Sequence, residues 1–301
     1  WRGVLRADGA RQARRGGEAV AFEYHPDWLT DPDRFSLEPA LTLNRGDFAP
    51  AAGLAMFGSI GDSAPDTWGR RLMQRAERCR AVREGRAVRT LAESDYLIGV
   101  ADVSRLGALR FRYTGGEMFE AQTAQGVPGL VELGRLMAVT DRILRDEETD
   151  ADLQMIFAPG SSLGGARPKA SLIDHHGRLS IAKFPKPDDD YSVERWESVA
   201  LTLAGMAGVR VAAHELIEVA GQAILLSRRF DREGERRIPF LSALSMMGLK
   251  DGERGSYPEL VDVLVQTGAQ TKRDAADLYR RMVLNVLISN VEDHLRNHGF
   301  L

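Results

Sequence analysis

Three short stretches of the sequence contain residue types that bind phosphate or move protons. The first is the run Gly160-Ser161-Ser162-Leu163-Gly164-Gly165-Ala166-Arg167-Pro168-Lys169. Glycine and other small residues let backbone N–H groups approach phosphate oxygens closely, and Lys169 would add a positive charge. Gly160 and Gly165 have the spacing of a Walker A loop, but the Gly-Lys-Ser/Thr sequence of that motif does not follow. An ordinary turn is the competing interpretation.

The second stretch places Lys183 inside the apolar segment Ile181-Ala182-Lys183-Phe184-Pro185. A lysine ammonium group is costly to bury unless an acid pairs with it. In protein kinases a strand lysine holds the α- and β-phosphates of ATP and pairs with a helix glutamate. Glu194 and Glu197 lie in the next predicted helix, and either could be the partner. The alternative is an edge-strand lysine whose ammonium group reaches water.

The third stretch follows a long apolar helix pattern and reads Asn290-Val291-Glu292-Asp293-His294-Leu295-Arg296-Asn297-His298. A kinase catalytic loop carries a carboxylate base and, five residues later, an asparagine that binds a metal ion. Glu292 and Asn297 have this spacing, and Asp293 is a neighbouring second carboxylate. A zinc site on His294 and His298 is a rival interpretation, but neither a His-Glu-x-x-His pattern nor a cysteine ligand supports it.

The elements that must position these residues are strands and helices before about residue 235 and mainly helices after it. Strand patterns cover 20–24, 108–113, 170–174, 179–184 and 223–226, and helix patterns cover 66–84, 128–146, 192–208 and 272–289. Larger side chains alternate in 20–24 and 108–113, 223–226 is a continuous apolar run typical of a buried strand, and apolar residues recur at helical spacing in the helix patterns. The sequence therefore predicts an α/β protein, with an α+β N-terminal part and a mainly α-helical C-terminal part. Ligands prefer the junction between such parts.

The composition is that of an ordinary globular protein. The chain has 301 residues, 44% of them apolar and 28% charged, which is enough for two lobes around a substantial core. Its formal net charge of −3 gives no general reason to bind nucleic acid. The single cysteine, Cys79, excludes an intrachain disulfide and fits a cytoplasmic location. Neither a signal peptide nor an apolar run of the roughly 18–20 residues needed to span a membrane is visible.

The three stretches, taken together and in this order, resemble the HipA toxins, Ser/Thr kinases of bacterial type II toxin–antitoxin modules. The segments similar to the family's phosphate loop, nucleotide lysine, interlobe motif and catalytic loop are, in turn, Gly164 to Lys169, Lys183, Arg229-Phe230-Asp231-Arg232 and Asn290 to Leu301. The segment from Asp62 to Arg71 also resembles the family. The similarity spans about residues 20–301.

The resemblance implies a two-lobed, kinase-like HipA fold that is incomplete at its C-terminus. The implied domains are an N-terminal subdomain at 1–113, a kinase core N-lobe with the phosphate loop at 114–235, and a truncated helical C-lobe at 236–301. The implied activity is ATP- and Mg²⁺-dependent phosphorylation of proteins. The expected partners are a helix-turn-helix antitoxin, operator DNA mainly through that antitoxin, and a protein substrate such as an aminoacyl-tRNA synthetase. A membrane is not among them.

The resemblance also assigns roles by position in the motifs. The implied residues are Glu292 and Asp293 for catalysis, Asn297 for the metal ion, Ser162 with Ser161 beside it for autophosphorylation, and Ser162, Gly164, Gly165, Ala166, Lys169, Lys183, Arg229, Phe230 and His294 for the nucleotide.

Two departures from the family leave other functions open. The family usually has Asp where this sequence has Glu292, and a carboxylate misplaced by about 1 Å can cost on the order of 10²-fold in rate. Family members also carry a further metal-binding Asp beyond the point where this chain stops. One alternative is therefore a weakly active or inactive pseudokinase that serves as a binding module for an antitoxin–DNA complex. The other is a small-molecule kinase, since antibiotic kinases share the loop chemistry.

A run of arginines lies in and after the helix pattern at 66–84. It consists of Arg75, Arg78, Arg80, Arg83, Arg86 and Arg89, and Glu77 and Glu84 partly offset its charge. One interpretation is a solvated helix face. The other is a surface for an antitoxin or for the phosphates of operator DNA.

Overall fold

The computed structural model describes residues 3–8, 18–121, 126–160 and 165–301. The chain forms two compact units, and each unit draws on separate stretches of sequence. Unit 1 comprises Trp1–Asp62, Ala92–Ser94 and Phe240–Leu301, and unit 2 comprises Ser63–Leu91 and Asp95–Pro239. The three domain ranges inferred from the sequence stay a prediction, because compactness alone does not define a functional domain.

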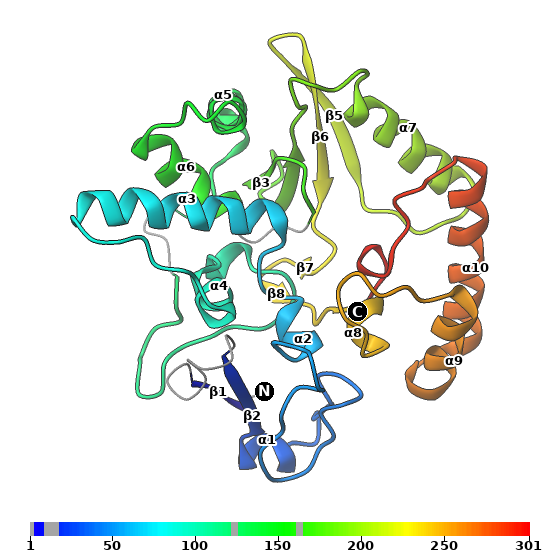
Figure 1. Ribbon diagram of the computed structural model, residues 1–301. Coiled ribbons are helices and arrows are strands. Elements are labelled where there is room, and N and C mark those ends of the chain that lie inside the picture. Colours follow the sequence, from blue (N-terminus) through cyan, green and yellow to red (C-terminus); the bar gives the residue numbers. More distant parts are fainter. Residues whose placement is uncertain (1–2, 9–17, 122–125, 161–164) are drawn as a thin grey trace. The chain divides into compact units, whose positions relative to one another are not determined.

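Unit 2 contains a four-stranded antiparallel sheet in the order β3-β4-β6-β5 (Figure 1). The strands are β3 (Lys169–Ile173), β4 (Leu179–Lys183), β5 (His214–Val219) and β6 (Gln222–Arg228). The strands predicted at 170–174, 179–184 and 223–226 are therefore confirmed as β3, β4 and β6. A short hairpin of β7 (Arg232–Glu233) and β8 (Arg236–Arg237) follows β6.

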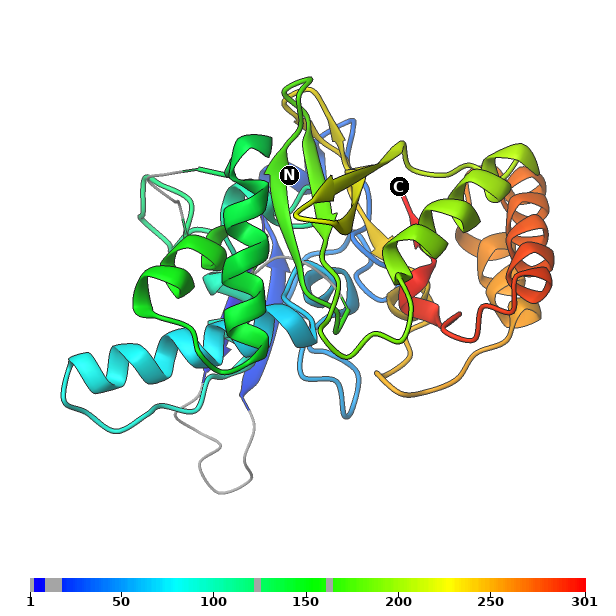
Figure 2. The same ribbon diagram turned by 90° about the horizontal axis from the view of Figure 1, so that it is seen from above.

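Helices pack against both sides of this sheet. Figures 1 and 2 show α3 (Thr67–Arg83), α5 (Leu133–Leu144) and α6 (Asp150–Gly160) on one side and α7 (Val193–Met206) on the other. The core of the unit joins the first side to the sheet through Trp68, Leu72, Leu136, Ile143, Ile156, Leu172, Phe184 and Leu226. The helices predicted at 66–84, 128–146 and 192–208 are confirmed as α3, α5 and α7. The shorter α4 (Glu93–Gly99), η1 (Asp102–Ser104) and η2 (Leu130–Glu132) connect them.

The strand predicted at 108–113 is wrong, because this segment is irregular and pairs with no described strand. The guanidinium group of Arg110 forms an ion pair with Asp102 and lies 3.7 Å from the ring centre of Phe119. The guanidinium group of Arg105 lies 4.7 Å from the ring centre of Phe111. Arg110 and Phe111 thus contact neighbouring loops, and the alternation of arginine and apolar residues only resembles that of a strand.

Unit 1 contains two small antiparallel ribbons and several helices. β1 (Gly3–Asp8) pairs with β2 (Ala19–Tyr24), and β9 (Leu241–Ser242) pairs with β10 (Gly299–Phe300). The helices are α1 (Pro26–Thr30), α2 (Gly58–Gly61), α8 (Ala243–Met246), α9 (Tyr257–Thr267), α10 (Thr271–Leu287) and η3 (Leu295–Asn297). The strand predicted at 20–24 and the helix predicted at 272–289 are confirmed as β2 and α10.

The burial of α10 differs from the sequence expectation. The apolar pattern suggested a buried helix, but only Leu278 is buried, while Tyr279, Val286 and Leu287 are exposed. The spacing of apolar residues determines which face of a helix is apolar, whereas burial requires a neighbour that covers the face. None of the helices in the described ranges has the length and apolar character that crossing a bilayer requires.

Candidate functional site

The residues singled out by the sequence fall into two groups, one in each unit. Unit 2 contains Gly165, Ala166, Lys169, Lys183, Arg229 and Phe230. Unit 1 contains Glu292, Asp293, His294 and Asn297. Ser161, Ser162 and Gly164 lie outside the described residues. Each group is therefore considered by itself.

Lys183 is the last residue of β4, and its ammonium group forms an ion pair with Glu197 of α7. Both side chains are about one third exposed, at 30% and 33%. Of the two glutamates left open by the sequence, Glu197 is thus the partner of Lys183, whereas Glu194 pairs with Arg167. A lysine that is partly exposed and held by one carboxylate can still contact a second anion.

Lys169 lies directly opposite Lys183 on the neighbouring strand. Its side chain is buried, and its pKa is lowered to about 8, first by burial and then by the positive charge of Lys183. Like charges opposite each other on paired strands destabilise a sheet. The negative charges of Asp66 and Glu197 act against this repulsion, and Arg167 adds to it. The two lysines therefore form a place where an anion such as a phosphate is favoured.

The end of the glycine run is held by the first turn of α3. The N–H of Gly165 donates to Oδ2 of Asp66 at 2.8 Å, and its carbonyl accepts from the N–H of Trp68 at 3.1 Å. The indole N–H of Trp68 donates to the carbonyl of Lys169 at 2.9 Å. Gly165 has a φ of +81°, and Nζ of Lys169 lies 2.8 Å from where a Cβ would stand. A side chain at this position would therefore strain the backbone and crowd the lysine.

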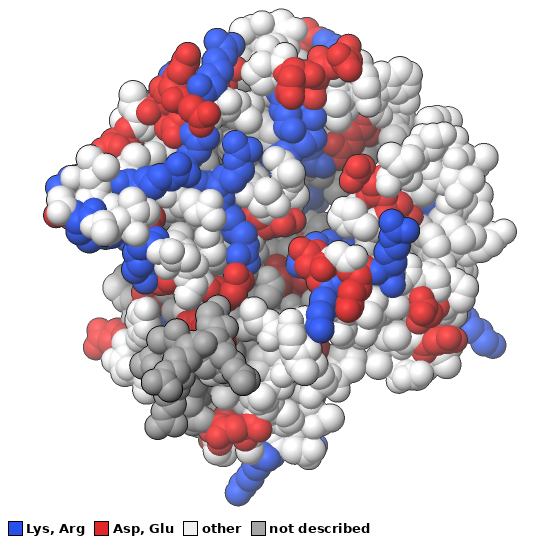
Figure 3. Space-filling view, in the orientation of Figure 1, with Lys and Arg blue, Asp and Glu red and all other residues white. Residues whose placement is uncertain are grey.

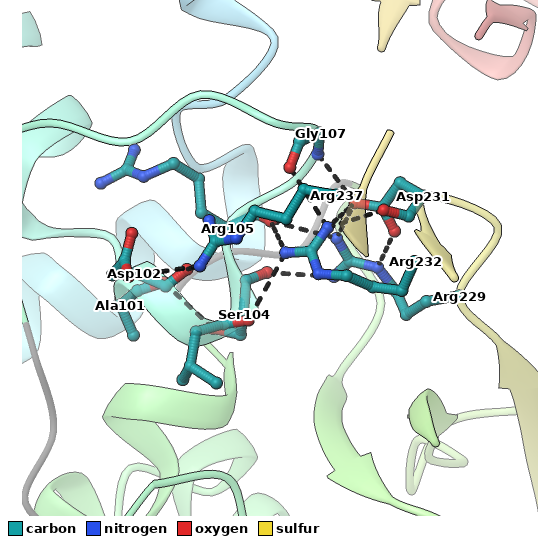
Figure 4. Close-up of polar contacts among 10 residues, drawn as sticks. Ala101, Asp102, Ser104, Arg105, Gly107, Arg229, Asp231, Arg232 and Arg237 are labelled. Carbon is teal, nitrogen blue, oxygen red and sulfur yellow. Dashed lines mark hydrogen bonds and ion pairs between the residues drawn. The ribbon is translucent and has the colours of Figure 1, made fainter. Parts of the chain in front are cut away.

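The interlobe motif contains a buried ion pair at the end of β6, shown in Figure 4. Nε and Nη2 of Arg229 donate to the two carboxylate oxygens of Asp231 at 2.6 and 2.5 Å. The same guanidinium group donates to the carbonyls of Ser104 and Arg105 at 3.0 and 3.3 Å. Phe230 lies between the paired residues and is 47% exposed. Within this motif Phe230 is thus the most exposed side chain.

In unit 1, Asp293 holds the loop that follows α10. Oδ1 of Asp293 lies 2.8 Å from Nε2 of His298, and Oδ2 accepts a hydrogen bond from the hydroxyl of Tyr257. Burial alone would raise the pKa of Asp293, but the Tyr257 hydrogen bond and the charge of His298 lower it below its ordinary value. These contacts fix the Asp293 carboxylate between Tyr257 of α9 and His298 of the same loop.

Glu292 differs from its neighbour because its side chain is exposed. Its carboxylate makes no hydrogen bond or ion pair with any described residue, whereas its backbone carbonyl accepts from Nδ2 of Asn297. That bond orients the Asn297 amide and leaves Oδ1 for another ligand. Oxygen ligands of this kind suit Mg²⁺, which usually takes one or two protein groups together with phosphate oxygens.

The zinc interpretation finds no support in the structure. His298 bonds to Asp293, and His294 is exposed at the start of η3. Over the described ranges, there is no group of three or more His, Cys, Asp and Glu side chains that could hold a metal ion.

The arginine run divides into two sets. Three members form ion pairs with acids of unit 2, namely Arg75, Arg86 and Arg89. Three others are exposed and make no ion pair with a described residue, namely Arg78, Arg80 and Arg83. Figure 3 shows Lys and Arg side chains along α3 with Asp and Glu side chains close by. This mixture favours a solvated, ion-paired face.

Sequence reasoning missed Asp66, Trp68 and Tyr257 as residues that support the site. Asp66 precedes the α3 pattern and caps that helix by accepting the Thr67 N–H, which a capping signature in the sequence could have indicated. Its bond to Gly165, 99 residues away, has no local signal. The same holds for Tyr257, which lies 36 residues before Asp293.

Comparison with known proteins gives two findings. Residues 161–301 match the sequence model of the family described as the HipA-like C-terminal domain, and none of the curated proteins matches the chain. The structure is similar to that of HipA from Shewanella oneidensis MR-1, part of a toxin–antitoxin system, solved as a complex with HipB and its operator DNA. The TM-score is 0.60 at 18% sequence identity, covering 99% of this chain and 70% of that chain. Residues 161–301 therefore carry the sequence pattern of the HipA-like C-terminal domain family, and the chain has the α/β fold of HipA that the sequence predicted.

Proposed function

We propose that this protein is the kinase toxin of a toxin–antitoxin module and that it phosphorylates serine or threonine in a protein substrate. The observation that carries the proposal is the Lys183–Glu197 ion pair, with Lys169 opposite Lys183 on the neighbouring strand. A strand lysine paired with a helix glutamate is the arrangement that protein kinases use to hold ATP phosphates. The HipA-like family match supports the same class.

The proposed roles follow from the groups that each residue offers. ATP with Mg²⁺ would supply the phosphoryl group. The ammonium groups of Lys183 and Lys169 would bind phosphate oxygens, together with the backbone N–H group of Ala166. Gly165, whose N–H donates to Asp66, would let the backbone approach the phosphates closely. Phe230 would contact the nucleotide base, and Arg229 would hold Phe230 in place. His294 stays a proposed nucleotide contact because of its position in the sequence motif.

The loop after α10 would contribute the groups that act on the substrate. Oδ1 of Asn297 would bind Mg²⁺, and the exposed Glu292 carboxylate would orient the substrate hydroxyl and accept its proton. Asp293 would hold the loop through Tyr257 and His298.

The proposal extends to regulation and partners. Ser162, with Ser161 beside it, is the proposed autophosphorylation site because of its position in the motif. A phosphoserine there would add roughly −1.5 to −2 charges and would repel ATP phosphates. The similar Shewanella protein was solved with HipB and operator DNA. By analogy, the proposed partners here are a helix-turn-helix antitoxin, operator DNA mainly through it, and a substrate such as an aminoacyl-tRNA synthetase.

A binding module without kinase activity is the second candidate function. It is favoured by one observation, which is that Glu292 stands where the family usually has Asp. Such a pseudokinase would keep the fold and the antitoxin surface but transfer phosphate poorly.

Replacing Lys183 with Ala tests the nucleotide site. We expect the affinity for ATP with Mg²⁺, measured by calorimetry, to fall about 10- to 100-fold, because charge-assisted hydrogen bonds contribute roughly 1.5–3 kcal/mol. Lys272→Ala is the matched control, since Lys272 is exposed at the start of α10. An unchanged affinity in Lys183→Ala would remove Lys183 from the site, and with it the main support for a kinase.

A further inference from the structure

Arg167, directly after the glycine run, joins that run to the beginning of α7. Its Nη1 and Nη2 donate to the two carboxylate oxygens of Asp189 at 2.7 and 2.5 Å. Nη2 also donates to Oε1 of Glu194 at 3.1 Å. Asp189 lies in the loop before α7 and accepts the N–H of Lys186 at 2.8 Å. A bidentate arginine–carboxylate pair of this kind sets both distance and orientation.

Burial makes this contact more demanding than a surface ion pair. Glu194 is 1% exposed, and its Oε2 is buried without a hydrogen bond to any described residue. Arg167 is the one cation bonded to Glu194 in the described part of the chain. A buried carboxylate that loses its cation is strongly destabilising. Arg167 therefore neutralises the buried carboxylate in the first turn of α7.

The residues next to Arg167 and to Glu194 make further contacts, with α3 on one side and with Lys183 on the other. Two residues before Arg167, Gly165 is held by Asp66 and Trp68 of α3. Three residues after Glu194, and so on the same face of α7, Glu197 pairs with Lys183. A continuous path thus leads from the end of the glycine run to the Lys183–Glu197 ion pair.

The N-cap residue of α7 does not cap the helix with its side chain. Its N-cap residue, Ser192, makes no side-chain hydrogen bond to the first turn. An uncapped helix end leaves N–H groups without protein partners and frays more easily. The buried contact of Arg167 with Glu194 and the exposed Arg195–Glu218 ion pair are therefore the ion pairs that hold the first turn.

We infer that Arg167 is a positioning residue that fixes the first turn of α7, so that Glu197 stays in place to orient the Lys183 ammonium group. The inference rests on the proposed function in one respect, which is that the ligand bound by Lys183 is the phosphate group of ATP. The restraint on α7 is a property of the chain alone and can be measured without a ligand.

Three variants separate positioning from folding. Arg167→Met removes all the contacts, and Arg167→Lys keeps the charge without the bidentate geometry. The double variant Arg167→Met/Glu194→Gln also removes the buried charge, so stability recovers while the restraint stays absent. Arg195→Met is the matched control, because it removes the exposed ion pair between Arg195 and Glu218 on the same turn of α7.

The measurements are amide hydrogen exchange in α7 and calorimetric affinity for ATP with Mg²⁺. In the double variant we expect exchange of the hydrogen-bonded amides of α7, beginning with the Trp196 N–H that donates to the Ser192 carbonyl, to become about tenfold faster. We expect ATP affinity to fall at least about tenfold. Arg167→Lys should lie between this variant and the parent, and Arg195→Met should match the parent.

The outcomes distinguish the inference from the function on which it rests. Unchanged exchange in α7 overturns the inference, whether or not the protein binds ATP. Faster exchange with unchanged ATP affinity also overturns it, because α7 would then not position Lys183. If exchange rises but the parent protein binds no ATP, the restraint by Arg167 is supported and the proposed function fails.

Discussion

At the scale of single residues, the two neighbouring carboxylates of the loop after α10 have different surroundings. Asp293 is held between Tyr257 and His298, whereas the Glu292 carboxylate is exposed and has no described partner. A general base must reach the substrate hydroxyl, and an exposed, unbonded carboxylate is free to do so. Glu292 is therefore the better candidate for the base.

Substitution of Glu292 tests this assignment. Glu292→Gln should lower single-turnover phosphotransfer by about 10²- to 10⁴-fold while sparing ATP binding, because an amide cannot accept the proton. Glu292→Asp should keep or raise the rate, since the family usually has Asp at this position. The measurement is the single-turnover rate together with ATP affinity.

Asp293→Asn is the matched comparison on the adjacent residue. It should act mainly through stability, lowering the free energy of unfolding by about 1–3 kcal/mol as the bonds to Tyr257 and His298 weaken. Wild-type rate in Glu292→Gln together with an inactive Asp293→Asn would identify Asp293 as the base. A parent protein that transfers no phosphate would favour the binding module instead.

At the scale of elements, α3 supports the glycine run through one side chain that packs and hydrogen-bonds at once. Trp68 is fully buried in the core of unit 2, and its indole N–H donates to the carbonyl of Lys169. The contact joins positions 101 residues apart and fixes the beginning of α3 against β3. The N-terminal segment that resembles the family thus has a structural role beside the candidate phosphate site.

Substitution of Trp68 should destabilise the protein in proportion to what is removed. Trp68→Phe should cost about 1–3 kcal/mol, because the Lys169 carbonyl loses its donor, and Trp68→Ala about 3–5 kcal/mol, because a cavity forms as well. Chemical denaturation measures both. Trp196→Phe, an exposed tryptophan on α7, should change stability by less than about 0.5 kcal/mol. Equal effects at the two tryptophans would contradict the anchoring role of Trp68.

At the scale of the whole molecule, buried and half-buried carboxylates have pKa values shifted in opposite directions, and these shifts make stability depend on pH. Asp231 and Asp293 have lowered pKa values, since hydrogen bonds and nearby cations outweigh burial. Glu38 and Asp62 in unit 1 have raised pKa values, first because of burial. The first pair stabilises the fold above the ordinary carboxyl pKa, and this contribution is lost as the pH falls through their lowered values.

Glu38 offers a test of the opposite sign. Because its pKa is raised above the ordinary 4.5, its stabilising contribution is present in acid and is lost as the pH rises through the folded-state value. Glu38→Gln keeps an oxygen for the Ser59 N–H, now 2.6 Å from Oε2, and removes the buried charge. We expect Tm to rise at pH 7 and the gain to vanish near pH 4. Thermal melts across this range, with the exposed Glu235→Gln as control, give the answer, and a lower Tm at pH 7 would contradict it.

The sequence by itself determined the features that depend on near neighbours in the chain. The hairpin of β3 and β4, the helix patterns of α3 and α7, and the Glu292–Asn297 spacing follow from residue types at short range, where periodicity and turn chemistry act. The match of residues 161–301 to a HipA-like domain agrees with the family resemblance that these local patterns indicated.

Only the tertiary structure decided which distant groups meet. Glu197 rather than Glu194 pairs with Lys183, Asp66 accepts the Gly165 N–H, and the Tyr257 hydroxyl donates to Asp293. One face of α10 is exposed, and segment 108–113 pairs with no described strand. The reason is physical. An ion pair, a buried face or a strand pair depends on what lies across the fold, and a pattern along the chain contains only the residue's own half of that contact.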